Sequence, residues 1–226
     1  MEKICSTYQR APELAAQGAH VISTDEKTGI QATERLHETK PVRPGLVERV
    51  EFEYIRHGTL SLIANFDVAT GRVISPAIGP TRTESDFVAN IEKTVDTDPQ
   101  GIFIFIVDQL DTHKSASLVE MVARRCGIDL DLGVKGKRGV LKSKKTRRAF
   151  LEDESHRIRF VYTPRHCSWL NQVEIWFSIL ARRLLKRSSF ASCDELRTRV
   201  LAFIDYFNAV LAKPFRWTYT GRPLQA

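Results

Sequence analysis

Acidic side chains close two predicted strands and recur inside a late predicted helix. Asp25 follows the short strand-like segment His20–Thr24, Asp108 follows the apolar run Ile102–Val107, and Glu174 lies in a long amphipathic segment. Three carboxylates brought together without cationic neighbours repel one another, so they are tolerable only around cations. Hard oxygen ligands of this kind suit Mg²⁺ or Mn²⁺. The pattern therefore predicts a divalent-metal site.

A pair of such ions has a defined chemistry. Two ions roughly 3.5–4 Å apart clamp the attacking and leaving oxygens of an in-line phosphoryl displacement. We therefore expect Asp25, Asp108 and Glu174 to be catalytic residues that share two metal ions. The alternative for Asp108 alone is a turn or a cap on the following helix, which is a common role for aspartate.

The run Ile102–Val107 identifies the central element of the fold. Six consecutive apolar residues, without polar alternation, are typical of a strand buried on both faces of a mostly parallel sheet. The carboxyl edge of such a sheet is where α/β proteins place their ligands, and Asp108 falls there. Around this strand we predict a mixed five-stranded sheet, with three antiparallel strands followed by parallel ones, flanked by helices.

The other predicted elements follow from periodicity and turn residues. A strand ends at Asp25, and residues 32–56, which contain Pro41, Pro44 and Gly45, are predicted to leave the sheet. The remaining strands are predicted at Thr59–Asp67, Arg72–Ile78 and Arg157–Tyr162, and the helices at Pro12–Gln17, Ser85–Thr97, Ser115–Cys126, Trp169–Arg187 and Cys193–Leu211.

Composition places the chain among ordinary globular proteins. It has 226 residues, of which 42% are hydrophobic and 27% charged, which is enough for one substantial core. No apolar run approaches the roughly 18 residues of a membrane span, and the N-terminus lacks the apolar centre of a secretory signal. We therefore expect a cytoplasmic protein without a membrane partner. The four cysteines form no CxxC pair, which makes a zinc site unlikely.

The net charge of +7 is concentrated in two groups of basic residues. Stripes of this kind are expected where a protein binds a polyanion, because phosphate contacts release condensed counterions. We expect them to bind DNA, and the alternative for the first group is a solvated flexible loop. The first group comprises Lys135, Lys137, Arg138, Lys142, Lys144, Lys145, Arg147 and Arg148, and the second comprises Arg182, Arg183, Lys186 and Arg187.

Three polar residues lie near the proposed ligands in sequence and are expected to support them. His113 follows Asp108 by five residues, and its alternative role is to cap the next helix. His166 has the same two interpretations. Asn171 lies about one helical turn before Glu174, a spacing suited to a supporting hydrogen bond. Trp169 and Trp176 are expected to be core residues rather than stacking platforms for bases.

Three segments also resemble a known family. Asp25–Gln31, Val107–His113 and Thr163–Phe177 are similar to the signature blocks of the bacterial insertion-sequence branch of the mariner-like DDE transposases. The resemblance covers residues 20 to about 222. It implies an RNase H-like fold, a catalytic triad on Asp25, Asp108 and Glu174, Mg²⁺ dependence, and cut-and-paste movement of a DNA element into TA targets. It also implies double-stranded DNA partners, namely element ends and target, and a homodimer on DNA.

The chain departs from the pattern of this family in three respects. Gln109 stands where the second block usually has Asn, and the interval from Asp108 to Glu174 is longer than in many members. The added length coincides with a basic insertion at about 128–157. The family's N-terminal helix-turn-helix is not recognisable, so we interpret residues 1–19 as the tail of an upstream region and residues 20–226 as the catalytic domain.

Two other functions remain open at this point. A DNA-binding relic or regulator would keep the basic surface without catalysis, but the presence of all three acids favours an enzyme. Another RNase H-like nuclease, such as a junction resolvase, shares the metal chemistry. It would not require the block Thr163–Phe177.

Overall fold

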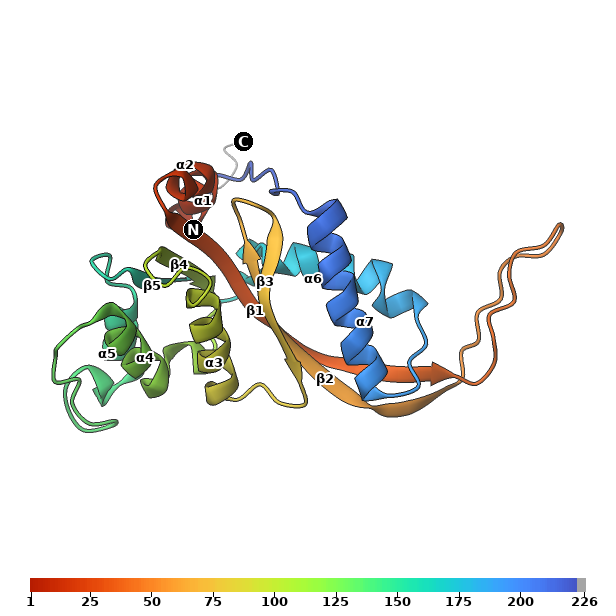
Figure 1. Ribbon diagram of the computed structural model, residues 1–226, viewed down its shortest axis with the longest axis horizontal. Helices are drawn as coiled ribbons and strands as arrows, with labels where there is room; N and C mark the ends of the chain where they lie inside the picture. Colours follow the sequence, from red (N-terminus) through yellow and green to blue (C-terminus); the bar gives the residue numbers. More distant parts are fainter. Residues whose placement is uncertain (223–226) are drawn as a thin grey trace.

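A five-stranded mixed sheet forms the centre of the protein (Figure 1). The computed structural model describes residues 1–222, and of Arg187 the backbone alone. The strands lie in the order β3-β2-β1-β4-β5, with antiparallel pairing from β3 to β1 and parallel pairing from β1 to β5. This arrangement confirms the predicted mixed sheet. The strands are β1 (Ala19–Arg35), β2 (Tyr54–Asp67), β3 (Arg72–Gly79), β4 (Ile102–Val107) and β5 (Ile158–Tyr162).

Strand β4 is buried on both faces, as its unbroken apolar sequence predicts. Phe103, Phe105 and Val107 point into one hydrophobic cluster, whereas Ile104 and Ile106 point into the other. All five side chains are at most 4% exposed. Because successive residues of a strand face opposite sides, a layer of helices must cover each side.

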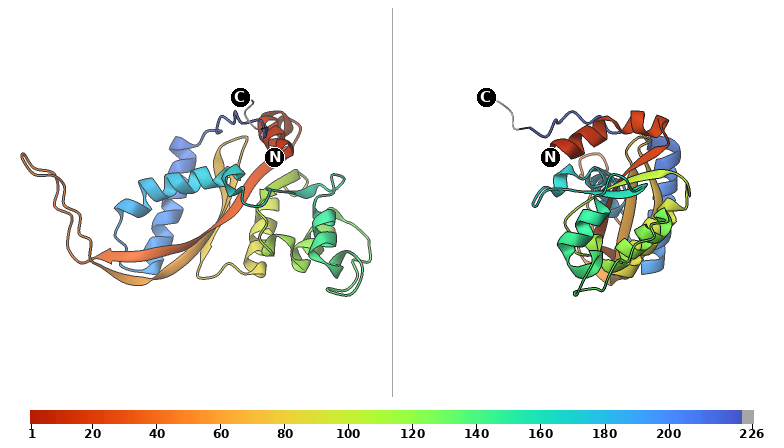
Figure 2. Two further views of the ribbon diagram at one scale, coloured as in Figure 1. Left: turned by 180° about the vertical axis from the view of Figure 1, so that it is seen from behind. Right: turned by 90° about the vertical axis from the view of Figure 1, so that its left-hand side faces the viewer.

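Helices cover both faces of the sheet (Figures 1 and 2). Helices α3, α4 and α5 bury one face, and α1, α6 and α7 bury the other. No helix in residues 1–222 is long and apolar enough to cross a membrane. The helices are α1 (Glu2–Gln9), α2 (Ala11–Ala16), α3 (Glu84–Val95), α4 (Ala116–Cys126), α5 (Lys144–Leu151), α6 (Val173–Arg183) and α7 (Cys193–Tyr206).

Side-chain caps fix where the main helices begin and end. Thr83 accepts a hydrogen bond from the backbone of Asp86 at the start of α3, and Ser115 and Ser192 cap α4 and α7 in the same way. Gly127 ends α4 with a φ of 65°, the left-handed conformation that glycine adopts without strain. The sequence also predicts the start of α7 at Ser192 and the end of α4 at Gly127, and both are confirmed, whereas α3 begins slightly before the predicted Ser85.

Strands β1 and β2 are much longer than predicted. The prediction that the chain leaves the sheet at residue 32 is wrong, because β1 continues to Arg35 and β2 resumes at Tyr54. Their antiparallel pairing extends to this point with shifts in register after Lys27 and after Ala32. Tertiary pairing therefore overrides the polar composition of this stretch.

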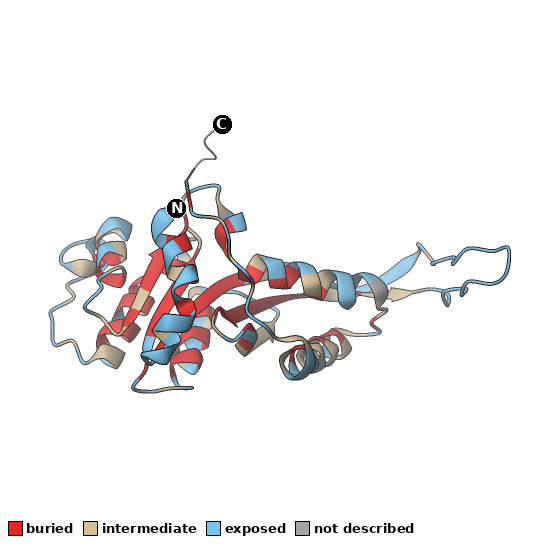
Figure 3. Cartoon of the chain, turned by 90° about the horizontal axis from the view of Figure 1, so that it is seen from above, coloured by how far each residue is buried: buried red, intermediate tan, exposed pale blue. Residues whose placement is uncertain are grey.

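Residues 36–53 form a two-stranded arm that projects far beyond the sheet and the helices (Figures 1 and 3). Two isolated bridges, Lys40 to Arg49 and Arg43 to Leu46, hold its two sides together. Its apolar side chains face solvent, with exposed fractions of 79% for Val47 and 83% for Phe52. The arm adds nothing to the core of its own chain.

Three helical segments differ from the sequence-based prediction. The helix predicted over Trp169–Arg187 starts only at Val173, because residues 168–170 form a separate 3₁₀ turn and Asn171 has an extended backbone. Helices α1 and α5 were missed because they are short and mostly polar. Residues 1–19 pack on the sheet through buried Ile4, Tyr8 and Ala11. The four cysteines are free, and Cys5 is buried.

Candidate active site

The three predicted carboxylates come from separate elements. Asp25 lies on β1, two residues beyond the last pairing of β1 with β4, between Ser23 and Ile106. Asp108 is the first residue after β4, and Glu174 is in the first turn of α6. The charges of Asp108 and Glu174 both reach the Asp25 carboxyl and raise its pKa. The parallel pairing of β1 and β4 thus brings Asp25 and Asp108 to one edge of the sheet, and the start of α6 places Glu174 near enough to act on Asp25.

Asp25 is buried near other carboxylates. Only 7% of this residue is exposed. Burial, followed by repulsion from Asp108, Glu26 and Glu174, raises the pKa of Asp25 to about 7, even though the backbone N–H of Glu26 donates to its carboxylate at 2.8 Å. The ionised form of Asp25 is therefore costly unless a cation joins it.

Asn171 connects Asp25 to the start of α6. Its Nδ2 donates to Asp25 Oδ2 at 3.1 Å and to the backbone oxygen of Thr24 at 2.9 Å. Its Oδ1 accepts from Ser23, whose hydroxyl also accepts from the backbone N–H of Val173 at 2.9 Å. The side chain of Asn171 thus hydrogen-bonds Asp25 rather than Glu174, three residues further along, which the sequence spacing had suggested.

Asp108 has an ionic environment. Its Oδ1 lies 2.8 Å from Nδ1 of His113 and accepts from the backbone N–H of Leu110 at 2.8 Å. Burial favours the neutral acid, but the hydrogen bonds from His113 and Leu110 outweigh it, and the pKa of Asp108 lies below its ordinary value. Asp108 is therefore ionised without help from a metal.

His113 lies between two carboxylates and is completely buried. Its Nδ1 contacts Asp108, and its Nε2 lies 3.1 Å from Oε1 of Glu26. Burial disfavours its charge, but the two carboxylates raise the pKa of His113 to about 9. Its ring also packs on Phe87 with centroids 4.2 Å apart. His113 therefore orients Asp108 from inside the protein and cannot contact a phosphate in solvent.

Glu26 is a site residue that the sequence-based interpretation missed. It directly follows Asp25 on β1, so its side chain points to the opposite face of the sheet, toward α3 and α4. There its carboxylate is 2% exposed and contacts His113. The signal in the sequence was an acid directly after the proposed ligand Asp25, at the end of a predicted strand.

The donor set fits a divalent ion. Within residues 1–222, no three His, Cys, Asp or Glu side chains are already gathered as a group that could hold an ion. Two observations nevertheless suit a hard cation. Asp25, Asp108 and Glu174 supply only oxygen ligands, and burial together with repulsion from the neighbouring carboxylates raises the pKa of the Asp25 carboxyl. A cation among these carboxylates would offset the repulsion and favour the ionised form of Asp25.

Comparison with protein families decides the class of the chain. Residues 20–197 match the family of DDE superfamily endonucleases. The chain belongs to this family. A comparison with curated protein sequences finds no match.

Solved structures show the same fold as this member of the family. The Mos1 mariner paired end complex with Mn has a TM-score of 0.55 and 12% sequence identity, over 91% of this chain and 54% of that chain. A pre-cleavage Mos1 transpososome gives 0.53 and 12%, over 96% of this chain and 57% of that chain. The expected RNase H-like fold is therefore confirmed. The endonuclease spans little more than half the length of the Mos1 chains.

The basic segment of the endonuclease lies beside the loop that follows Asp108. In its helix α5, Lys144 forms an ion pair with Asp111 at 2.5 Å, and Arg148 stacks on Tyr162. Most of the predicted phosphate-binding residues are exposed, but Arg147 is buried and cannot contact a phosphate in solvent. The exposed members are Lys135, Lys137, Arg138, Lys142, Lys144, Lys145, Arg182 and Arg183, and the side chain of Arg187 lies outside the described structure.

Two residues of the loop before α6, His166 and Trp169, form no hydrogen bond to a proposed ligand within the described residues. His166 is exposed, has a positive φ of 60°, and forms no hydrogen bond within the described residues. Trp169 was expected in the core, but it is 53% exposed and packs against Tyr219. Trp176, by contrast, is fully buried as predicted.

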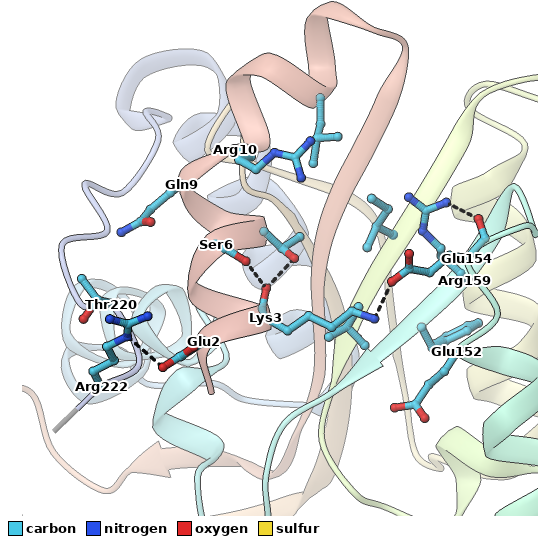
Figure 4. Close-up of a pocket in the computed structure, with 15 residues that line it drawn as sticks. Glu2, Lys3, Ser6, Gln9, Arg10, Glu152, Glu154, Arg159, Thr220 and Arg222 are labelled. Atoms are coloured by element: carbon cyan, nitrogen blue, oxygen red, sulfur yellow. Dashed lines mark hydrogen bonds and ion pairs between the residues drawn. The ribbon is translucent and has the colours of Figure 1, made fainter.

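A spacious groove of about 870 Å³ lies elsewhere, between α1 and β5 (Figure 4). Ion pairs cross it, with Lys3 lying 2.8 Å from Glu154 and Arg222 lying 2.9 Å from Glu2. None of the three proposed ligands lines it. This groove is therefore separate from the proposed carboxylate site.

Proposed function

We propose that this chain is the catalytic domain of a transposase that cleaves DNA strands at the ends of a mobile element and joins them to target DNA. Cut-and-paste transposition is the reaction that we infer. The observation that supports the proposal is that Asp108 and Glu174, from separate elements, lie close enough to Asp25 for their charges to raise the pKa of its buried carboxyl. The DDE endonuclease family and the shared fold with Mos1 complexes support it.

We infer that Asp25, Asp108 and Glu174 would hold two Mg²⁺ or Mn²⁺ ions. When bound, such ions supply electrostatic stabilisation of an in-line phosphoryl displacement. The protein's own contribution is to hold the ligands ready. His113 keeps Asp108 ionised and oriented, and Asn171 fixes one oxygen of Asp25. Both supports are buried, so solvent does not compete with them.

The proposed DNA surface is the exposed basic segment beside the Asp108 loop, together with Arg182 and Arg183 at the end of α6. Lys142 and Lys145 are exposed and form no ion pair among the described residues, so their charges are available to phosphates. These contacts would add affinity without base specificity. We infer that sequence-specific recognition of element ends belongs to a helix-turn-helix half upstream, and that the protein acts in the cytoplasm.

We also propose that the transposase works as a homodimer on DNA. The arm of residues 36–53 supports this inference because it projects away from its own core and exposes Val42, Val47 and Phe52. Exposed apolar surface of this kind is typical of an interaction site. A second copy of the chain is the partner that a symmetric pair of element ends would supply.

A nicking assay tests the proposed function. The protein, alone and joined to its end-binding half, is incubated with plasmid carrying the element in Mg²⁺, Mn²⁺ or EDTA. We expect nicks at the element ends with either metal and none in EDTA. DNA binding without nicking would instead indicate a regulator. Cleavage of branched DNA, without preference for the ends, would indicate another RNase H-like nuclease.

A further inference from the structure

The side chain of Gln109 joins three parts of the endonuclease beside Asp108. Its Nε2 donates to the backbone oxygen of Thr163 at 2.6 Å. Its Oε1 accepts from Nζ of Lys114 at 3.2 Å and from Nη1 of Arg148 at 3.4 Å. One carboxamide therefore contacts the end of β5, the loop after β4 and helix α5.

The bond to Thr163 extends the parallel ladder between β4 and β5 beyond the strands. The backbone N–H of Thr163 donates to the oxygen of Val107 at 2.9 Å. In a ladder that continued, the backbone N–H of residue 109 would donate to the oxygen of Thr163 next. The chain turns instead at Asp108, which accepts from the N–H of Leu110. The side chain of Gln109 takes over the role of the missing backbone donor.

The length of Gln109 decides whether this bond can form. The related transposases resembled by the sequence usually have Asn at this position. Asn is shorter by one methylene, or about 1.5 Å of a carbon–carbon bond. From the same backbone its amide would stop at about 4 Å from the Thr163 oxygen, too far for a hydrogen bond. The longer amide is therefore matched to this chain.

The oxygen of Gln109 meets two cations that belong to the surroundings of the site. Lys114 is 8% exposed, and its Nζ also donates to the backbone oxygen of Gln109 at 2.7 Å. Arg148 lies over the ring of Tyr162 at 5.0 Å, and the hydroxyl of Tyr162 donates to the backbone oxygen of His113 at 2.6 Å. The loop from Asp108 to Lys114 is thus tied to α5 as well as to β5.

We propose that Gln109 is a positioning residue that sets where Asp108 stands relative to the end of β5 and to the basic helix α5. The end of β5 matters because a single loop, residues 163–172, connects it to the start of α6, where Glu174 lies. The inference rests on the proposed function, since it assigns Gln109 a part in placing two of the proposed metal ligands. Gln109 itself is not assigned any contact with metal or DNA.

The test compares wild type with Gln109→Asn, which keeps the amide but shortens it. In metal-free protein, we expect amide hydrogen exchange of residues 110–114 to speed up by about fivefold to tenfold, as one hydrogen bond is lost. We expect Mn²⁺ affinity, measured by titration without DNA, to weaken by about tenfold. Cleavage should need correspondingly more metal, while the affinity for DNA stays within about twofold.

Two further variants keep the test decisive. Gln109→Glu preserves length but replaces the Nε2 donor with an oxygen that repels the Thr163 oxygen, so it should show the same faster exchange even if Gln109→Asn does not fold. Gln100→Asn is the matched control, because Gln100 is exposed near the opposite end of β4 and should change neither measurement. Exchange and Mn²⁺ affinity like those of wild type in both Gln109 variants would overturn the proposal.

The outcome also separates this inference from the proposed function. If wild type cleaves DNA and the Gln109 variants match it in exchange, metal affinity and metal requirement, only the positioning role fails. If wild type never cleaves DNA with Mg²⁺ or Mn²⁺, the proposed function fails. Hydrogen exchange in the metal-free protein still decides the role of Gln109 in that case.

Discussion

Asp25 and Asp108 are two carboxylates at one edge of the sheet with opposite surroundings. Asp25 accepts hydrogen bonds from the uncharged Asn171 side chain and from a backbone N–H, and the pKa of Asp25 is raised to about 7. Asp108 contacts the imidazolium of His113, and the pKa of Asp108 is lowered. The two acids therefore differ in how much they need a metal.

This difference suggests a division of roles within the proposed site. Asp108 carries its negative charge in the metal-free protein because it contacts His113, whose other ring nitrogen contacts Glu26. Asp25 carries an unfavourable charge that binding of a cation would stabilise. Asp108 is therefore ionised before a metal binds, whereas Asp25 would lose its proton when a metal binds.

The largest effect should be shared by both acids. Asp25→Asn and Asp108→Asn should each reduce DNA cleavage at least about a thousandfold, because the proposed ions contribute several kcal/mol to the reaction. A rate assay on element-end DNA checks this, with a filter-binding measurement of affinity beside it. The same substitution at exposed Asp205 on α7 is the control. Full-rate cleavage by either variant would remove that residue from the catalytic set.

A second prediction separates the two acids by stability. At pH 8 in EDTA, Asp25→Asn should raise the unfolding free energy by about 2 kcal/mol, because it removes a buried charge that resists ionisation. Asp108→Asn should lower the unfolding free energy by about 1–2 kcal/mol, because the substitution leaves the buried His113 with only one carboxylate partner. This value allows for the partial exposure of Asp108. Urea unfolding measures both. Changes of the same sign would contradict the comparison.

The pH dependence sharpens the Asp25 half of the comparison. Its folded-state pKa of about 7 lies above the ordinary 3.8, so the folded protein holds a proton on Asp25 that the unfolded chain loses. The contribution of Asp25 to stability is therefore present below pH 4, falls as the pH rises toward 7, and is flat above it. The stability gained by Asp25→Asn should grow over this interval in EDTA. A gain independent of pH would show that Asp25 is not the titrating group.

The smallest expected effect is on the affinity for DNA, through the basic segment beside the Asp108 loop. Changing Lys142 and Lys145 together to Gln should weaken binding equally for all DNA sequences and flatten its salt dependence by up to about two units of slope, roughly 0.9 per lost contact. Changing exposed Lys3 and Lys93 together to Gln is the matched control. A salt titration of the two double variants decides this, and equal slopes would place the basic segment away from DNA.

Local patterns in the sequence were sufficient for the order and mixed character of the sheet. The apolar run of β4, the helix cap at Ser192 and the glycine end at Gly127 depend on neighbouring residues only, and they were predicted correctly. The lengths of β1 and β2 were not predictable in this way. Their outer parts are polar and form strands because they pair with each other.

The sequence by itself determined that an acid lies just beyond the paired stretch of β1 and another directly after β4, and the parallel pairing of these strands places Asp25 and Asp108 at the same edge. Only the tertiary structure decided their surroundings. Glu26 and His113 are 87 residues apart, and Asn171 is 146 residues from Asp25. Such pairs are set by the packing of whole elements, which no local pattern encodes. The opposite pKa shifts of the two acids therefore emerge only in the folded protein.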